Sequence, residues 1–244
     1  MSKLYVVGIG PGGYEQMTVK AVKVLEECDI IVGYTVYVDL VAEHFAGKEM
    51  LTTPMRQEEK RCRMAFDEVM KGRNTAMICS GDAGVYGMSG LIYEISRDYP
   101  GIEIEIVSGV TAALSGGAVL GAPLMHDFAV ISLSDLMTPW ELIQKRLAAV
   151  ASADMAICLY NPSSKKRKDY LNKACQIVML YASPATVCGI VRQIGRDGEF
   201  FEVMTLQELS NYEADMFTTV FIGNTTTKVI NGRMVTPRGY KLSE

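Results

Sequence analysis

Apolar runs and amphipathic stretches alternate along the first half of the chain. The apolar or alternating runs are typical of strands, and they cover residues 4–10, 29–34, 75–81 and 102–109. The stretches between them carry apolar residues at helical spacing, and they cover residues 17–28, 57–72 and 88–99. This order of strands and helices predicts a wound, largely parallel sheet.

The second half also alternates, but several of its strands follow one another closely. Its strand-like runs cover residues 128–134, 155–161, 185–191, 200–206 and 218–224. Helical patterns over residues 138–151 and 168–180 separate only some of these runs. We therefore expect a second α/β arrangement in which the strand directions are mixed.

A small, glycine-rich stretch, VTAALSGGAVLGAP, lies between the two halves. Its composition favours a helix that packs closely against its neighbours, followed by a turn at Gly121, Ala122 and Pro123. We place the junction between two domains at this turn. The sequence thus predicts an α/β protein with an N-terminal domain over residues 1–120 and a C-terminal domain over residues 121–244.

Composition excludes several classes of partner. The chain has 244 residues, 49% of them hydrophobic, and can bury a sizeable core. Its net charge of −4 and the lack of a basic tract argue against nucleic acid as a partner. No apolar run approaches the ~20 residues of a membrane span, and no secretory signal pattern precedes the first strand, so we expect a cytoplasmic protein without a membrane partner.

Cysteines and histidines show no metal-ligand spacing. The two histidines are His44 and His126, and the six cysteines are Cys28, Cys62, Cys79, Cys158, Cys175 and Cys188. No C-x-x-C pair occurs among them, so we expect no metal site. The cysteines are interpreted as small buried hydrophobic residues.

The stretch VVGIGPGG has the glycine spacing of a dinucleotide-binding turn. Such a turn needs an acidic residue at the far end of the second strand, where it binds the ribose hydroxyls. Here that strand ends in Gly33 and Tyr34, while Asp29 precedes it. Pro11 also removes a backbone N–H from the loop that should hold the pyrophosphate. The match is therefore interpreted as a coincidence of spacing.

A second glycine loop, ICSGDAGVYGM, follows a buried strand in the middle of the first half. Open α/β sheets bind ligands at the carboxyl ends of their strands, and glycines let the backbone approach a ligand closely. An ordinary strand-to-helix turn capped by Asp82 is the alternative interpretation. Two glycine loops of this kind together favour a ligand site.

Five stretches, taken in order, resemble the tetrapyrrole methyltransferases: VVGIGPGG, SGDAGVYGM, VSGVTAALSGGA, LYNPSSKKR and TTVFIGN. The resemblance covers nearly the whole chain. It implies the tetrapyrrole methylase fold, class III, in which S-adenosylmethionine binds in a cleft between two α/β domains. Within the family, VGYTVYVDL, TPMRQEEKR and LYNPSSKKR look most like the enzymes of cobalamin biosynthesis that methylate C17 of precorrin-3B or cobalt-factor III.

Several positions match cofactor-binding residues of the family. The resemblance implies contacts to S-adenosylmethionine from Pro11, Gly81, Asp82, Ala83, Tyr86, Thr111, Ala112, Tyr160, Gly189 and Thr219. Tyr160 stands where the family often has Met or Leu. For Thr111, packing of a helix N-terminus on Gly116 is the alternative role.

The implied chemistry needs alignment more than nucleophilic catalysis. The resemblance implies that C17 attacks the methyl group, S-adenosylhomocysteine leaves, and the ring contracts as the meso carbon C20 is extruded within an acetyl group. Because a sulfonium already activates the methyl group, the protein must chiefly align the three reacting atoms. Proton transfers accompany the contraction, and some titratable group should assist them.

Four residues are candidates for these catalytic roles: Tyr34, Arg56, Asp82 and His126. Tyr34 and Arg56 occupy places where siroheme-forming relatives carry an acidic residue and a lysine. The phenol could move a proton and the guanidinium could clamp a substrate carboxylate, against the alternatives of aromatic packing and a solvated arginine. His126 is a candidate because histidine is the side chain that commonly moves protons near neutral pH, and Asp82 could hold cofactor or substrate.

A substrate with many carboxylates also calls for local positive charge. One basic cluster consists of Arg56, Lys60, Arg61 and Arg63, and helical spacing would place Arg56, Lys60 and Arg63 on one face. A second basic run covers residues 165–168 and is more simply interpreted as a solvated surface. The resemblance further implies a homodimer. Methylation of another ring position, a nicotinamide-dependent oxidoreductase and a non-catalytic ligand sensor are alternative functions.

Overall fold

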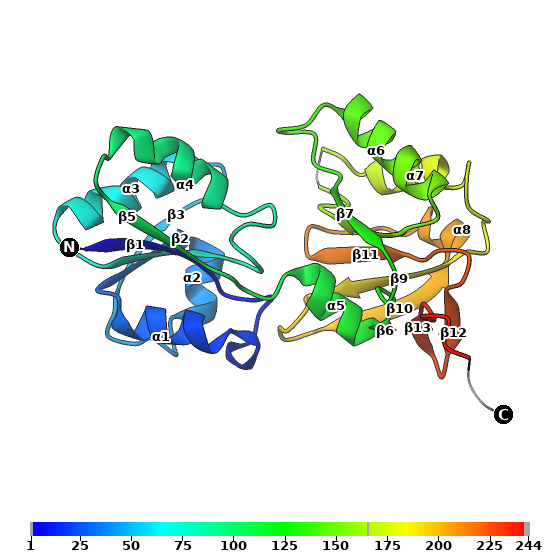
Figure 1. Ribbon diagram of the computed structural model, residues 1–244, viewed down its shortest axis with the longest axis horizontal. Coiled ribbons are helices and arrows are strands. Elements are labelled where there is room, and N and C mark those ends of the chain that lie inside the picture. The colour runs from blue at the N-terminus through cyan, green and yellow to red at the C-terminus, as the bar shows by residue number, and fades with distance from the viewer. Residues whose placement is uncertain (1, 165, 242–244) are drawn as a thin grey trace. The chain divides into compact units, whose positions relative to one another are not determined.

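The computed structural model describes residues 2–164 and 166–241, and the chain forms two compact units. Unit 1 covers Met1–Ala112 and unit 2 covers Ala113–Glu244. Helix α5 (Ala112–Leu120), apart from its first residue, therefore belongs with unit 2, whereas the sequence analysis assigned it to the first domain. Each unit contains its own five-stranded sheet (Figure 1).

Unit 1 is built on an all-parallel sheet of order β3-β2-β4-β1-β5. Its strands are β1 (Lys3–Gly8), β2 (Ile30–Tyr34), β3 (Glu49–Thr53), β4 (Thr75–Cys79) and β5 (Glu103–Val107). The predicted parallel sheet is confirmed. Because all strands run the same way, the loops that follow them meet at one edge, which we call the carboxyl edge of unit 1.

Helices cover both faces of this sheet (Figure 1). They are η1 (Tyr14–Gln16), α1 (Val19–Glu27), α2 (Thr35–Val41), α3 (Glu58–Met70), α4 (Ser89–Ile95) and η2 (Ser96–Asp98). In β1, Val7 packs with α1 and α2, whereas Leu4 and Val6 pack with α3 and α4. A strand with apolar side chains on both faces is expected in a parallel sheet covered on both sides.

Unit 2 has a mixed sheet of order β10-β9-β11-β8-β7. Its strands are β7 (Phe128–Ser132), β8 (Ala156–Tyr160), β9 (Val187–Arg192), β10 (Phe200–Thr205) and β11 (Thr218–Ile222). Only β7 and β8 pair in parallel among these neighbours, and the other pairs are antiparallel. The predicted mixture of strand directions is confirmed.

One face of the unit 2 sheet packs against α6 (Trp140–Ser152), α7 (Tyr170–Val178) and α8 (Leu206–Leu209), and α5 packs on the other (Figure 1). The α5 contact is close: a Cβ on Gly116 would lie 2.9 Å from Ile194 Cδ1, and one on Gly189 would lie 2.7 Å from Leu120 Cδ2. The close packing predicted from the small residues of this helix is thus confirmed. A small sheet of β6 (Gly121–Ala122), β12 (Lys228–Ile230) and β13 (Arg233–Val235) completes unit 2.

All six cysteines are buried and free, as the sequence analysis predicts. Burial raises the pKa of the thiols of Cys28 and Cys79 to about 11 and of Cys62 and Cys175 to about 12. These thiols therefore stay protonated near neutral pH and behave as hydrophobic side chains. Among the described residues, no helix is long and apolar enough to cross a membrane.

Candidate functional site

The loops after β1 and β4 are joined directly at the carboxyl edge of unit 1. The backbone N–H of Gly10 donates to the carbonyl oxygen of Gly81 at 3.1 Å, and the N–H of Gly81 donates back to the oxygen of Gly10 at 2.7 Å. Ile9 N–H extends the pairing to the oxygen of Cys79 at 2.9 Å. The two glycine loops that the sequence analysis singled out therefore form one structure.

Three glycines pack backbone against backbone at the same edge. A Cβ built on Gly109 would lie 2.1 Å from the oxygen of Gly81, and one on Gly8 would lie 2.7 Å from that oxygen and 2.7 Å from Gly109 N. No side chain fits at such distances. The loops after β1, β4 and β5 can meet only because these positions are glycine.

Asp82 holds these loops through backbone hydrogen bonds. Its Oδ1 accepts from the N–H groups of Gly84 at 2.8 Å and Val85 at 3.2 Å, and its Oδ2 accepts from Gly109 N–H at 2.9 Å. Both carboxylate oxygens are thus engaged with the main chain. The bonds from Gly84 and Val85 give Asp82 the turn-capping role of the alternative interpretation. The bond from Gly109 also connects Asp82 to the loop after β5.

The candidate cofactor residues of unit 1 gather around this glycine structure. Pro11 is buried directly after Gly10, and an added Cβ on Gly81 would lie 3.7 Å from Thr111 Cα and 3.9 Å from Ala112 N. Thr111 and Ala112 are half-buried at the end of the loop after β5. Ala83 is fully buried, and its carbonyl oxygen accepts from Ser89 at the start of α4, so its role here is structural.

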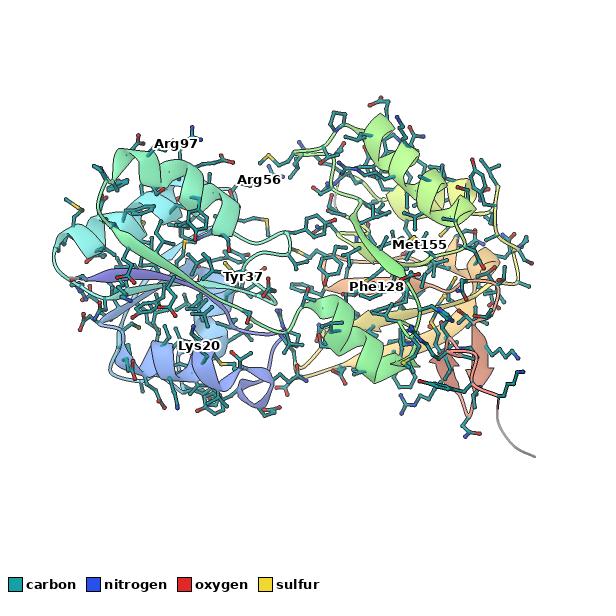
Figure 2. All side chains as sticks on the ribbon, viewed as in Figure 1. Lys20, Tyr37, Arg56, Arg97, Phe128 and Met155 are labelled. Carbon is teal, nitrogen blue, oxygen red and sulfur yellow. The ribbon has the colours of Figure 1, made fainter. Side chains whose placement is uncertain are left out.

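Two non-glycine residues of unit 1 have left-handed backbone conformations, and both lie in loops at the carboxyl edge. They are Arg56, with φ 66°, and Tyr86, with φ 54°. Both side chains are exposed. Strained backbone of this kind is concentrated at ligand sites in proteins, which supports this edge as the functional one. Figure 2 shows Arg56 and Tyr37 on this side of unit 1, with Arg97 farther back along the unit.

The basic residues before and within α3 do not form the predicted common face. Because α3 begins at Glu58, Arg56 precedes the helix, and the expectation that helical spacing aligns it with Lys60 and Arg63 is wrong. Lys60 is exposed, and Arg63 forms ion pairs with Glu59 and Asp98, both at 3.0 Å.

Arg61, which the sequence analysis grouped with the basic residues near α3 but left off their common face, is buried, with 5% of its surface exposed. Its guanidinium lies 5.8 Å from the centre of the Tyr34 ring, which in turn meets Tyr37 edge-on at 5.1 Å. Tyr34 is half-buried at the end of β2. The spacing of Arg61 to Ala65 could have placed Arg61 on the buried face of the helix.

Unit 2 contains the remaining cofactor candidates. The Tyr160 hydroxyl, at the end of β8, accepts a hydrogen bond from Ala113 N–H at 2.7 Å and so fixes the start of α5. Thr219 is buried in the neighbouring strand β11. Gly189 lies in β9 beneath Leu120, so packing of α5 already requires a glycine there.

His126 lies near the amino end of β7, at the opposite end of the strands from Tyr160. It is half-buried and precedes β7, and the start of β7 pairs in parallel with the start of β8, whereas Tyr160 ends β8. Figure 2 labels Phe128 and Met155 at the His126 edge. The structure therefore does not bring His126 next to Tyr160 or Thr219.

The basic run after β8 contains one anchored residue. Arg167 donates to Ser134 Oγ at 2.6 Å, to Ser164 Oγ at 3.0 Å and to Asp135 Oδ1 at 3.3 Å. Lys166 and Lys168 are exposed, as a solvated surface predicts, and Lys165 lies outside the described residues.

The carboxyl edge of unit 1 can hold a ligand against bare backbone. Its glycine loops put main chain without side chains at this edge, and their positions are fixed by Asp82 and by mutual hydrogen bonds. Asp29, by contrast, pairs with Asn74 before β2, at the opposite edge, so it does not stand where a dinucleotide-binding turn has its acidic residue.

The sequence pattern of the tetrapyrrole (corrin/porphyrin) methylases matches residues 3–210. The chain belongs to this family. A probable cobalt-factor III C(17)-methyltransferase of Salmonella typhimurium is 43% identical over 98% of the chain and 100% of the relative. A precorrin-3B C(17)-methyltransferase of Sinorhizobium is 36% identical over 97% of the chain and 96% of the relative. The chain spans 45% of another similar methylase, the cobalt-factor III methyltransferase of Priestia megaterium, at 41% identity.

Solved structures agree with this membership. The crystal structure of the methyltransferase CobJ is 33% identical, with a TM-score of 0.92 over 97% of this chain and 100% of that one. A cobalt precorrin-4 methyltransferase is 25% identical, with a TM-score of 0.76 over 91% and 94% of the two chains. The predicted class of two α/β domains, of the tetrapyrrole methylase type, is confirmed.

Proposed function

We propose that this protein transfers a methyl group from S-adenosylmethionine to C17 of a corrin precursor, with contraction of the ring, in cobalamin biosynthesis. The observation that carries the proposal is the full-length similarity to the Salmonella relative, at 43% identity. The joined glycine loops of unit 1 supply the binding edge that such a reaction needs.

Cobalt-factor III is the preferred substrate in this proposal. Relatives named for cobalt-factor III from Salmonella and from Methanocaldococcus jannaschii are 43% and 42% identical, whereas the relative named for precorrin-3B is 36% identical. Cobalt would then arrive with the substrate, and the chain itself needs no metal site.

The glycine edge fits S-adenosylmethionine. A side chain at Gly81 would stand beside Thr111 and Ala112, so its absence leaves a cradle in which a ligand can contact the main chain. S-adenosylmethionine supplies an already activated methyl group. The residues around the cradle bind and orient it: Pro11 and Gly81 shape the loop surface, Thr111 and Ala112 offer polar backbone, and Tyr86 borders the loop. Tyr160, Gly189 and Thr219 are proposed as further contacts from unit 2.

Asp82 acts as a positioning residue in this proposal, because its oxygens already accept three backbone hydrogen bonds. Tyr34 is the proposed proton-transfer group, since its phenol lies at the carboxyl edge. Arg56, exposed in its strained loop, is the proposed clamp for a substrate carboxylate. His126 remains a second candidate for proton transfer.

Calorimetric titration tests the cofactor part of the proposal. We expect micromolar binding of S-adenosylhomocysteine and no response to NAD or NADP. Binding of a nicotinamide nucleotide instead would favour an oxidoreductase and overturn the proposal. The homodimer expected from the resemblance is tested separately by light scattering at micromolar concentration.

A further inference from the structure

We propose that Arg61, with Gln57, forms a subsite for one peripheral carboxylate of the tetrapyrrole. The inference rests on the proposed function and names the part of the substrate that this corner of unit 1 recognises. Both residues belong to the beginning of α3, and Tyr34 and Thr53 lie beside them at the ends of β2 and β3.

The first observation is a buried cation without a counter-charge. Arg61 has 5% of its surface exposed, and within residues 2–164 and 166–241 no carboxylate lies within ion-pair distance of it. Arginine is rarely buried to this extent unless it is paired, because desolvating the charge is costly. A carboxylate from a ligand would supply the missing partner.

The second observation is how the guanidinium is held. Nε donates to Thr53 Oγ1 at 2.9 Å and Nη2 donates to the carbonyl oxygen of Pro54 at 3.3 Å. Neutral oxygens thus fix its orientation without neutralising it. Nη1 donates to none of the described residues, and it is not among their fully enclosed unpartnered atoms, so this nitrogen can be reached from outside.

Gln57 provides an independent sign of a ligand. Its Oε1 is one of two enclosed side-chain polar atoms without a partner in the described chain. Gln57 is the N-cap residue of α3, and Arg61 N–H donates to its carbonyl oxygen at 2.9 Å, so the two residues lie one turn apart at the start of the helix. Rotation of the amide presents Nε2 as a donor, and two donors can then share one carboxylate.

The occupant follows from this chemistry. A guanidinium held in a fixed orientation suits a carboxylate, and the Tyr34 ring next to it suits a flat apolar neighbour. A macrocycle with peripheral carboxylates carries both features. S-adenosylmethionine has a single carboxylate, and its proposed contacts in unit 1 lie around the joined glycine loops instead.

Binding of cobalt-factor III, followed through its own absorbance, tests the subsite without requiring turnover. The protein variants are Arg61→Met, Arg61→Lys, Gln57→Leu and, as the matched control, Arg97→Ala, an exposed arginine in η2. We expect Arg61→Met to weaken tetrapyrrole binding about ten- to a hundredfold, with Arg61→Lys restoring part of the loss. S-adenosylhomocysteine affinity and the melting temperature of Arg61→Lys and Arg97→Ala should stay at parent values.

Esterified cobalt-factor III separates charge recognition from a structural role. Esterification should cost the parent more affinity than it costs Arg61→Met, because the variant has already lost this contact while Arg56 still favours the free acid. Such non-additivity is the coupling expected of a direct contact. If Arg61→Met does not fold, Arg61→Lys with the two ligands still decides the question. Parent-like tetrapyrrole binding by Arg61→Lys and Arg61→Met overturns the subsite alone. A parent that binds neither tetrapyrrole overturns the proposed function and the subsite together.

Discussion

The carboxylate of Asp82 accepts the backbone N–H of Gly109 at 2.9 Å and thereby ties the loop after β4 to the loop after β5. The two residues are far apart in sequence but meet at the carboxyl edge of unit 1. A parallel sheet brings such loops together, and the absence of a side chain on Gly109 lets them touch. The proposed cofactor edge depends on this tie.

Replacing Asp82 with Asn should loosen the edge. The amide keeps one acceptor but turns a donor toward a backbone N–H, and loss of hydrogen bonds to a charged group costs about 1.5–3 kcal/mol of unfolding free energy. We expect lower thermal stability and weaker S-adenosylhomocysteine binding in calorimetry, with Asp39→Asn, an exposed aspartate in α2, unchanged. Parent-like affinity in Asp82→Asn would show that this tie does not position the cofactor.

A glycine series tests the backbone contact. Gly109→Ala should destabilise unit 1 most, by roughly 1–3 kcal/mol or more, because its Cβ would collide with the oxygen of Gly81 at 2.1 Å. Gly81→Ala meets no close atom but must adopt φ +68°, which costs about 1–2 kcal/mol. Gly90→Ala, with open space in α4, should cost nothing. Thermal unfolding of the three variants checks this order, and equal effects would refute it.

Tyr160→Phe tests the structural role of that tyrosine. The change leaves Ala113 N–H without its acceptor at a residue only 1% exposed, an expected cost of about 1–3 kcal/mol. Urea unfolding should report the loss, while Tyr181→Phe, 53% exposed, should behave as the parent. Identical stability of Tyr160→Phe and the parent would mean that this hydrogen bond contributes nothing.

Acid should weaken the fold partly through Glu68. The hydrogen bond from Lys71, with help from Arg73, holds the pKa of the Glu68 carboxyl below its ordinary 4.5. Because the pKa of Glu68 is lower in the folded than in the unfolded state, its ionised carboxylate stabilises the fold at pH values above the unfolded pKa. This stabilisation is lost as the pH falls through the folded-state pKa. Unfolding free energy measured from about pH 6 to about pH 3 should therefore fall more steeply for the parent than for Glu68→Gln. A constant difference between the two curves would contradict the assignment.

Arg56→Ala tests the proposed substrate clamp. Its main chain should be undisturbed, because the N–H of residue 56 still donates to Glu58 Oε1 and Ala tolerates the left-handed backbone no worse than Arg. S-adenosylhomocysteine affinity should persist while kcat/KM falls about ten- to a hundredfold, the loss of about 1.5–3 kcal/mol of interaction. Arg97→Ala serves as control. Methyl transfer by Arg56→Ala at the parent rate would show that Arg56 does not bind a substrate carboxylate.

Much of the sheet arrangement followed from the apolar pattern, and the exceptions have physical reasons. Residues 35–41, TVYVDLV, are rich in β-branched residues that favour strands, yet they form α2 because its apolar side packs on the sheet. The edge strand β3 and the hairpin of β12 and β13 carry mixed polar residues and gave no signal.

The site was only partly predictable for a different reason. The glycines of the loops after β1 and β4 are visible in the sequence, but the pairing of Gly10 with Gly81 depends on strand order. The hydrogen bonds of Asp82 come from backbone N–H groups, and because every residue except proline has one, the sequence does not show which of them will be the donors. The sequence placed Arg61 in a basic cluster, but its burial depends on the packing of α3 against the sheet.

Incubation of the protein with S-adenosylmethionine and, separately, with cobalt-factor III or precorrin-3B, followed by mass spectrometry, tests the central claim most directly. The account predicts that cobalt-factor III gains one methyl group, located at C17, while S-adenosylhomocysteine accumulates in equal amount. No methylated product from either tetrapyrrole, or a methyl group at another ring position, would contradict it.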